Sequence, residues 1–433
     1  MFTGLRSGWS ANGPHFRAFL SATLASAVGT EITLLALPLF ALLTLDAGTG
    51  VIGLLTAAQF LPWLVLALPA GVLVDRTAHR PLLVGCDLGR AVLIGLVPVA
   101  AWMDLLSVPV LLVVVLAAGS LTVVFEIAAG AYLPQLVEPS RLGSANGALT
   151  TATAVAYVAG PPLGGALVGI VGAPRAVVLD ALSFLVSAAF LARIRARRAD
   201  ATGGDRQPAA TEGGTRWSRL MAGVELLRRD PALGRLTTFT ALFNVASNAV
   251  IVVLLVFLVR DAGLSPAALG LVYGLSAVGA IAGGALSSTI SRRLGLGRAI
   301  AIEIGVVTVG EIALAFTPAS AAAGPWAVIV MGVMFLAFTA FQAQAVTVRQ
   351  SRTPQHLLGR LLAAHRLAVF GAIPLGATLG GFLAEAIGRR ETLVLAAVWI
   401  TVVAVLPLTA PIRTLSEPIE PLDVTALQTP RAG

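Results

Sequence analysis

Apolar stretches of about twenty residues or more recur along this sequence of 433 residues. An α-helix rises about 1.5 Å per residue, so roughly 20 apolar residues cross the ~30 Å hydrocarbon core of a bilayer. Charged residues make up 12% of the chain, against about 25% in soluble proteins. The sequence predicts an all-α membrane protein with twelve transmembrane helices, at 17–43, 49–74, 81–103, 108–133, 145–171, 174–194, 236–259, 266–290, 299–317, 325–347, 361–387 and 392–411.

The arginines indicate how these helices are oriented. The net charge is +8, but the basic residues are dispersed between apolar stretches, so we expect no nucleic-acid partner. Loops that remain in the cytoplasm retain arginine and lysine during insertion. Most loop arginines lie on the side of the two termini, and the opposite side holds only Arg175, Arg260, Arg389 and Arg390. We expect a multi-pass protein of the plasma (inner) membrane with both termini in the cytoplasm.

The chain divides into two related halves. The stretches "LGGALVGIVG" (163–172) and "LGGFLAEAIG" (379–388) are 216 residues apart, and Phe125-Glu126 and Phe341-Gln342 share that offset. Two related helix bundles around a central cleft are typical of alternating-access transporters. We expect cytoplasmic tails at 1–16 and 413–433, six-helix bundles at 17–194 and 236–412, and a cytoplasmic linker at 195–235 that ends in an amphipathic helix.

Two motifs carry a family resemblance. The stretch "GVLVDRTAHR" (71–80) resembles the Gly-x-Leu-x-Asp-Arg-x-x-x-Arg signature that follows the second helix in the major facilitator superfamily. The stretch "GPPLGG" (160–165) resembles the antiporter motif of the same superfamily, and "DALSFL" (180–185) is similar to the branch that contains macrolide exporters and the enterobactin exporter. The resemblance covers essentially the whole chain and implies the fold of that superfamily, two pseudo-symmetric six-helix bundles.

The first motif ends an apolar run in a cluster of charge. Gly71 has no side chain, so we expect the second helix to approach a neighbour closely there. The resemblance implies that Asp75 accepts bonds from the start of the eleventh helix and latches the two halves together on the cytoplasmic side. Arg76 and Arg80 belong to the same gating motif. The alternative is a solvated loop whose arginines only keep it in the cytoplasm.

The second motif predicts a gating helix in the fifth span. Pro161 and Pro162 remove two backbone donors and bend the helix, while Gly160, Gly164 and Gly165 clear one face for close contact. A bent, tightly packed helix can seal a cavity. The resemblance implies that this motif marks exporters rather than importers. The alternative is a plain packing kink.

Acidic groups within the spans are candidates for ion coupling, because ionised side chains are costly in a membrane. Glu31 lies about 14 residues, or roughly 21 Å, from the cytoplasmic start of the first span, and the resemblance implies that this span lines the cavity. Glu31 is therefore the leading candidate to load and release a proton, and a structural role is the alternative. Glu126 in the fourth span is the second candidate, with Gln342 as its counterpart in the repeat.

Three further ionisable groups in the spans have simpler interpretations. Asp87 and Arg90 are three residues apart on one helix face, so we expect them to neutralise each other. Asp180 lies near the outer end of the sixth span, where we expect an interfacial position.

Polar groups on the helices expected to line the cavity are the candidates for contact with cargo. They are Gln59, Asn244, Asn248, Gln342 and Gln344. Such groups either hydrogen-bond cargo or hold helices together. The neighbouring aromatic residues predict a mostly apolar cavity that suits an amphiphilic organic molecule; these are Phe60, Trp63, Phe239, Phe243, Phe338 and Phe341.

These features predict a secondary efflux transporter, not an enzyme. It would export an amphiphilic compound, such as a drug, an antibiotic or a siderophore-like metabolite, in exchange for protons. We expect no metal or cofactor, because the acids are scattered singly and a chain without lysine has no Gly-x-x-x-x-Gly-Lys loop for ATP. The expected partners are a small organic cargo, protons and the lipid bilayer, and the protein is expected to act as a monomer. The alternatives are an importer or metabolite carrier with other ion coupling, and a non-transporting receptor or scaffold.

Overall fold

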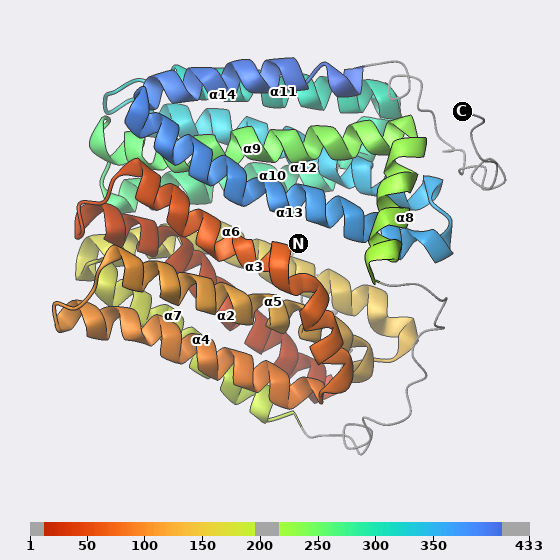
Figure 1. The fold of residues 1–433 in the computed structure, drawn as a ribbon, viewed down its shortest axis with the longest axis horizontal. Helices are drawn as coiled ribbons and strands as arrows, with labels where there is room; N and C mark the ends of the chain where they lie inside the picture. Colours follow the sequence, from red (N-terminus) through yellow and green to blue (C-terminus); the bar gives the residue numbers. More distant parts are fainter. Residues whose placement is uncertain (1–12, 195–215, 409–433) are drawn as a thin grey trace. The chain divides into compact units, whose positions relative to one another are not determined.

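The computed structural model describes residues 13–194 and 216–408 (Figure 1). Every regular element within these residues is a helix, and no strand is present among them. The expected linker residues 195–215 and the tail 413–433 lie outside the described residues, as do residues 1–12 of the expected N-terminal tail. The predicted all-α fold is confirmed.

Twelve helices of the described chain coincide with the twelve expected spans. The first six are α2 (Gly13–Leu43), α3 (Thr49–Arg76), α4 (His79–Trp102), α5 (Val108–Leu136), α6 (Leu142–Val171) and α7 (Ala173–Ala192). The second six are α9 (Pro231–Arg260), α10 (Pro266–Leu294), α11 (Leu296–Ala315), α12 (Ala323–Arg352), α13 (Gln355–Ala386) and α14 (Arg389–Val403). Two short 3₁₀ turns, η1 (Pro139–Arg141) and η3 (Leu406–Leu408), follow α5 and α14.

Among the described residues, ten helices are long and apolar enough to cross a membrane. The other two expected spans form α11 and α14. The 20 residues of α11 include Arg298, Glu303 and Glu311, and α14 has only 15 residues. The charged residues of α11 and the short length of α14 therefore distinguish these two helices from the other ten.

The predicted repeat has a structural counterpart in two tight turns. Gly172, with φ 83°, separates α6 from α7, and Gly388, with φ 108°, separates α13 from α14. Residues with a side chain rarely adopt these backbone angles, so glycine is favoured at both positions. The two glycines are the last residues of the two repeated stretches and share their offset of 216.

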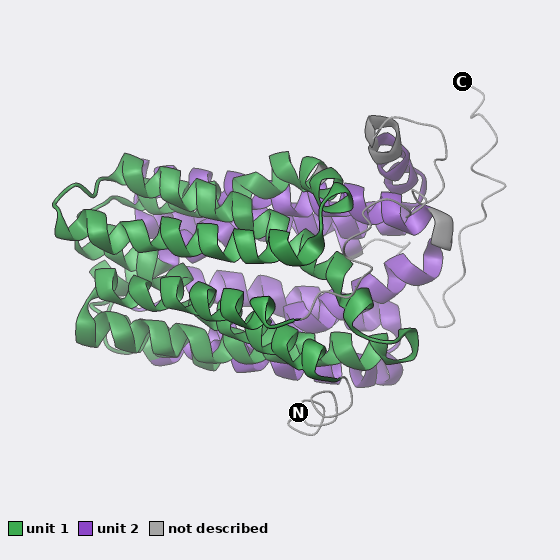
Figure 2. Cartoon of the chain, turned by 90° about the horizontal axis from the view of Figure 1, so that it is seen from below, with its two compact units in different colours: residues 1–207, 255–275, 319–324 green, residues 208–254, 276–318, 325–433 purple. Residues whose placement is uncertain are grey.

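The chain forms two compact units (Figure 2). Unit 1 contains residues 1–207, 255–275 and 319–324, and unit 2 contains residues 208–254, 276–318 and 325–433. The ends of α9, α10 and α12 that adjoin the loops 261–265 and 316–322 therefore belong to unit 1, although the sequence assigns these helices to the second bundle. The predicted bundle boundaries at 17–194 and 236–412 stay a prediction.

The interior of unit 1 combines large apolar side chains with close helix contacts. Phe19 of α2 packs edge-on against Tyr132 of α5, with ring centroids 6.0 Å apart, and both are buried. α2 also lies directly against α7, where a Cβ on Gly29 would overlap the side chain of Ser183. Small residues allow such approaches, which give membrane helices much of their packing energy.

The helices of unit 2 also pack through glycine. A Cβ on Gly279 of α10 would overlap the carbonyl group of Gly332 in α12. One turn along α10, a Cβ on Gly283 would lie 2.9 Å from the Cα of Leu336 and would overlap its carbonyl oxygen. The α10 and α12 backbones are therefore in direct contact over two successive turns.

Four phenylalanines expected near the cavity instead pack against one another between α9 and α12. The rings of Phe239 and Phe341 are perpendicular at 5.4 Å between centroids, and those of Phe243 and Phe338 stack at 4.6 Å. Phe239, Phe243 and Phe341 are buried. These three residues fill a helix–helix contact in unit 2, and the predicted apolar cavity stays a prediction.

The helix expected at the end of the linker is present as α8 (Arg216–Arg229). It packs on α13, because a Cβ on Gly223 would overlap the carbonyl oxygen of Arg360. Leu226 is buried, and Glu225 pairs with Arg229 at 2.7 Å, one turn apart. One face of α8 thus covers unit 2, and its predicted place at the membrane interface stays a prediction.

Replacing Gly279 with valine should destabilise unit 2, because the new side chain would force α10 and α12 apart. Overpacking of this kind costs about 1–3 kcal/mol. Thermal unfolding of the purified full-length protein should show a melting temperature lower by several degrees. The matched control is Gly305→Val on α11, where a Cβ would meet no atom within 4 Å. Equal melting temperatures for the two variants would contradict the assignment.

Candidate functional site

The stretch 160–165 of α6 touches two helices of unit 1 through adjacent faces. Residues four apart share one face of a helix. Gly160 and Gly164 face α2: a Cβ on Gly160 would overlap the β-carbon of Glu31, and a Cβ on Gly164 would lie 3.2 Å from the Cα of Ile32. The backbone of α6 therefore lies directly against the middle of α2.

The other face of the same stretch meets the first turns of α10. A Cβ on Gly165 would lie 2.9 Å from the Cα of Gly270 and would overlap the carbonyl oxygen of Pro266. In return, a Cβ on Gly270 would overlap the carbonyl oxygen of Pro161. Backbones this close allow weak Cα–H···O contacts in addition to van der Waals packing. The motif predicted to pack tightly is thus held between α2 and α10.

The two prolines explain part of this fit. Pro161 and Pro162 lie inside α6, and having no N–H, they leave the carbonyl groups of Tyr157 and Val158 without their usual helix donors. The Val158 oxygen lies 2.9 Å from the place of a Cβ on Gly274 of α10. A carbonyl group released from its own helix therefore faces the α10 backbone.

An ion pair lies on the arginine-poor side, which we define as the side of the loops at residues 44–48, 103–107 and 261–265. Arg260, at the end of α9, donates to the Asp46 carboxylate at 2.6 Å and to the Ala47 carbonyl group at 3.2 Å. The Asp46 side chain is 96% exposed. Ion pairs in water contribute only about 0–1 kcal/mol. This pair therefore orients the end of α9 but adds little to the stability of the fold.

Glu31 lies half-buried on the α2 face that meets α6. Its carboxyl group forms no ion pair and no hydrogen bond that is seen within the described residues. Tyr157, one turn before Gly160 on α6, interacts with it electrostatically. Tyr273 of α10 interacts in the same way with Tyr157, and its buried hydroxyl has no partner in the described part of the chain. Glu31 therefore lies beside the contact of α2, α6 and α10. The sequence assigns α2 and α6 to the first half of the chain and α10 to the second half.

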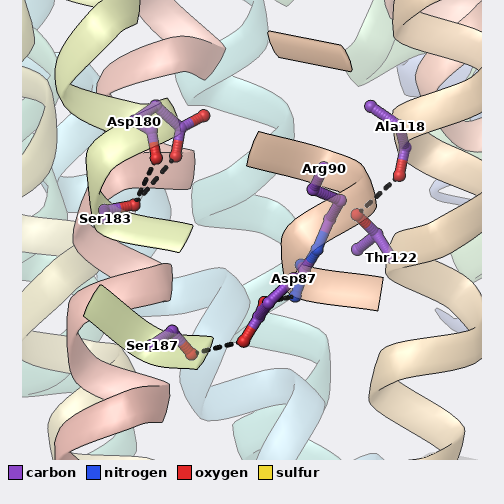
Figure 3. A network of polar contacts seen from close by, with 7 residues as sticks. All are labelled: Asp87, Arg90, Ala118, Thr122, Asp180, Ser183 and Ser187. Atoms are coloured by element: carbon purple, nitrogen blue, oxygen red, sulfur yellow. Dashed lines mark hydrogen bonds and ion pairs between the residues drawn. The ribbon is translucent and has the colours of Figure 1, made fainter. Parts of the chain in front are cut away.

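A buried polar network joins α4 to α7 (Figure 3). The Arg90 guanidinium donates to Asp87, and Ser187 donates to the second Asp87 oxygen at 2.6 Å. The guanidinium also lies over the rings of Phe125 and Phe184, at 4.2 and 4.3 Å from their centroids. The expectation that Asp87 and Arg90 neutralise each other is confirmed.

Asp180 lies two turns before Ser187 on α7 and is enclosed by protein, while its expected place near the membrane interface stays a prediction. The residue is only 1% exposed. Its carboxylate accepts a hydrogen bond from Ser183 at 3.1 Å, and Thr33 of α2 lies beside it. Burial follows from Gly29, because a helix without a side chain there packs directly over Asp180 and Ser183. The middle of α2 thus carries Glu31 on the face toward α6 and packs over Asp180 of α7 on another face.

The second predicted proton carrier has a different environment. Glu126 on α5 is exposed at the surface of unit 1. Its counterpart in the repeat, Gln342 on α12, is half-buried, and its Oε1 is enclosed without a hydrogen-bond partner among the described residues. Both roles stay predictions.

Three of the predicted cargo contacts form bonds within unit 2. Gln344 donates to Glu303 of α11 at 2.7 Å, and Asn244 of α9 donates to the Val369 carbonyl group of α13 at 3.2 Å. Asn248 donates to the Asn244 carbonyl group at 2.8 Å. These bonds correspond to the alternative in which such groups hold helices together.

The fourth candidate, Gln59, is half-buried on α3. Its carbonyl oxygen lies 2.7 Å from the place of a Cβ on Gly119 of α5, so the two helix backbones meet there. The Gln59 side chain forms no bond to another described residue, and contact with cargo stays a prediction for it.

The segment 71–80, which runs from the last turns of α3 into the start of α4, differs from expectation at one residue. A Cβ on Gly71 would meet no atom within 4 Å, so the close helix approach expected there is absent from this structure. Asp75 and Arg76 are exposed. Arg80 donates to the carbonyl groups of Leu191, at 3.2 Å, and Ala192. This arginine therefore caps the C-terminal end of α7, where a positive charge is favourable.

Comparison with known families gives one model that covers most of the chain. The model described as Major Facilitator Superfamily matches residues 19–377. The protein named multidrug efflux pump Tap from Mycobacterium tuberculosis H37Rv is 26% identical over 390 residues, which cover 88% of this chain and 90% of that protein. The pump of the same name from Mycolicibacterium fortuitum is 26% identical over 387 residues, covering 86% and 90%.

Solved structures agree in fold. A bacterial homologue of the iron transporter ferroportin, in an inward-facing state, superimposes with a TM-score of 0.72 at 18% identity and covers 91% of this chain and 97% of its own. The nucleoside transporter NupG superimposes with a TM-score of 0.71 at 13% identity, covering 91% and 98%. At this identity the likeness concerns the fold alone.

Replacing Gly165 with valine should separate α6 from α10, since its side chain has no room at the Gly270 backbone. A reporter cysteine in place of Ala267 on α10, in a Cys86→Ser background that removes the one native cysteine, measures the opening. We expect labelling of Cys at position 267 by a membrane-impermeant maleimide to rise several-fold. Gly147→Val, on the same helix but with no neighbour within 4 Å, should leave labelling unchanged. Equal labelling in all three proteins would refute the contact.

Proposed function

This chain belongs to the major facilitator superfamily, and from that premise we propose that it exports amphiphilic organic compounds by proton antiport. It is a multi-pass membrane transporter, with relatives at 26% identity that are named multidrug efflux pumps. Their names support efflux and a broad organic cargo. We further propose that it acts as a monomer in the plasma membrane with both termini in the cytoplasm, so that the arginine-poor side faces outward.

One observation carries the proposal: the same six residues of α6 contact the helix that bears Glu31 and the start of α10. An ionised carboxylate needs water or a cation, whereas a carboxylic acid tolerates a dry contact. Proton loading at Glu31 therefore favours the closed arrangement of α2, α6 and α10, and proton release favours an arrangement that admits water. Glu126, exposed on α5, is the proposed second carrier.

Closure of the outer side rests on two kinds of contact. The glycine contact between α6 and α10 supplies close packing over two turns, through Gly165 and Gly270. The Asp46–Arg260 pair joins the loop after α2 to the end of α9, and its Asp46 side chain is 96% exposed. Alternating access requires both to separate when the outer side opens. The ion pair is weak. It therefore favours the closed outer side slightly but still allows that side to open.

The proposed cargo follows from the polar groups that remain without helix partners. Gln342 has a buried amide oxygen with no bond in the described chain, and Gln59 lies among apolar neighbours on α3. A few amide groups in apolar surroundings suit a molecule with one or two polar groups on an apolar body. On the cytoplasmic side, Gly71, Asp75, Arg76 and Arg80 are the proposed gate.

Replacing Glu31 with glutamine should abolish proton-driven export, because the amide cannot exchange a proton. We would reconstitute the full-length protein in liposomes, impose a pH gradient, and follow transport of the fluorescent cation ethidium. The expected result is at least a tenfold loss of gradient-driven transport, with downhill exchange of ethidium retained. Glu138→Gln, an exposed acid in the α5–α6 loop, is the matched control.

Gradient-driven transport by Glu31→Gln at the wild-type rate would move proton coupling away from this residue. Transport that responds to a sodium gradient and not to a pH gradient would overturn proton antiport itself. If no cargo in a panel of cationic, neutral and anionic amphiphiles is transported, the efflux proposal fails.

Reversing the charge of either member of the outer ion pair should slow transport, and reversing both should restore it. Asp46→Arg and Arg260→Asp each place like charges together, whereas the double variant recreates the pair with opposite polarity. We expect a two- to fivefold loss of the initial rate in each single variant, in line with a contribution of about 1 kcal/mol or less. A double variant no faster than the slower single variant would show that the pair has no part in closure.

A further inference from the structure

Unit 2 contains a buried arginine that forms no ion pair with any described residue. Arg349 lies in the last turns of α12 and is only 3% exposed. Its Nε and Nη1 atoms are buried without a hydrogen-bond partner among the described residues. A buried cation without a partner is strongly destabilising. A group with five donors and no acceptor there indicates that an anion completes the site.

The side chains around Arg349 are suited to an anion. Thr353 directly follows the last residue of α12, four residues after Arg349, and is 5% exposed. Its buried hydroxyl has no partner within the described residues. His365 of α13 is 7% exposed and interacts electrostatically with Arg349. Its Nδ1 pairs with the hydroxyl of Thr237 in α9 at 3.2 Å. Three helices of unit 2 thus bring donors to one place.

The acidic group Asp230 pairs with a neighbour of Arg349 in the sequence and not with Arg349 itself. Asp230 accepts bonds from the amides of Ala232 and Leu233, at 2.8 and 3.1 Å, and caps the start of α9. Its second oxygen pairs with Arg352 at 2.8 Å. Asp230 therefore neutralises Arg352, and Arg349 has no carboxylate partner in the described part of the chain.

We propose that Arg349, Thr353 and His365 form a binding site for a small oxyanion, a carboxylate or phosphate group, at the end of unit 2 where α12 terminates. A guanidinium group presents two parallel N–H donors that match the two oxygens of such a group. The Thr353 hydroxyl can donate a third hydrogen bond. The anion could come from the solution or from the headgroup of an acidic lipid, and both sources offer the same chemistry.

The test is thermal unfolding of the full-length protein in neutral detergent, with inorganic phosphate or acetate added at constant ionic strength with chloride. A ligand that binds only the folded state raises the melting temperature. We expect a rise of several degrees for the wild type that saturates with anion concentration. The rise should be lost in Arg349→Gln and reduced in Thr353→Val. Arg293→Gln, an exposed arginine at the end of α10, should respond like the wild type.

If Arg349→Gln does not fold, Arg349→Lys keeps the charge and removes the paired donors, and it should need at least tenfold more anion for half the effect. Nanodiscs of phosphatidylcholine with and without phosphatidylglycerol distinguish the two sources. A response to the acidic lipid alone assigns the site to a headgroup, and a response to phosphate alone assigns it to a soluble anion. An unchanged melting temperature under all these conditions, or an equal response in Arg349→Gln, would overturn the proposal.

Discussion

Direct contact between helix backbones is the interaction on which this structure depends. Lipid chains are as apolar as the side chains that face them, so burial of apolar area holds membrane helices together weakly, and close van der Waals contact takes its place. Glycine allows that contact at α2–α7, α6–α10 and α10–α12. A side chain added at any of these crossings would meet a neighbouring backbone or a tightly packed side chain.

The contact of α6 with α2 and α10 links packing to chemistry. Gly160 allows α6 to lie against Glu31, and Gly165, five residues on, allows it to lie against Gly270. A change in the hydration of Glu31 therefore acts on a helix that is already seated against α10. Close-packed contacts have few intermediate arrangements, so a small change at the carboxyl group can select between a closed and an open contact. The exposed Asp46–Arg260 pair favours the closed contact, but it contributes little free energy.

Much of this could be predicted from the sequence, because bilayer thickness fixes helix length and the motif at 160–165 is local. The repeat that ends in Gly172 and Gly388 could be seen for the same reason. Contacts between distant residues could not be predicted: Arg260 and Asp46 are 214 positions apart. The burial of Asp180 could not be predicted either, because its position along α7 says nothing of the helix packed over it.

The central claim is that the α2–α6–α10 contact opens and closes with the ionisation of Glu31. Its most direct test is the distance between spin labels at the exposed loop positions Leu105 and Ala321, measured by pulsed electron resonance in nanodiscs over a range of pH. The account predicts two distance populations whose ratio changes with pH in the wild type and is fixed in Glu31→Gln. A single distance at every pH, or the same pH response in both proteins, would contradict it.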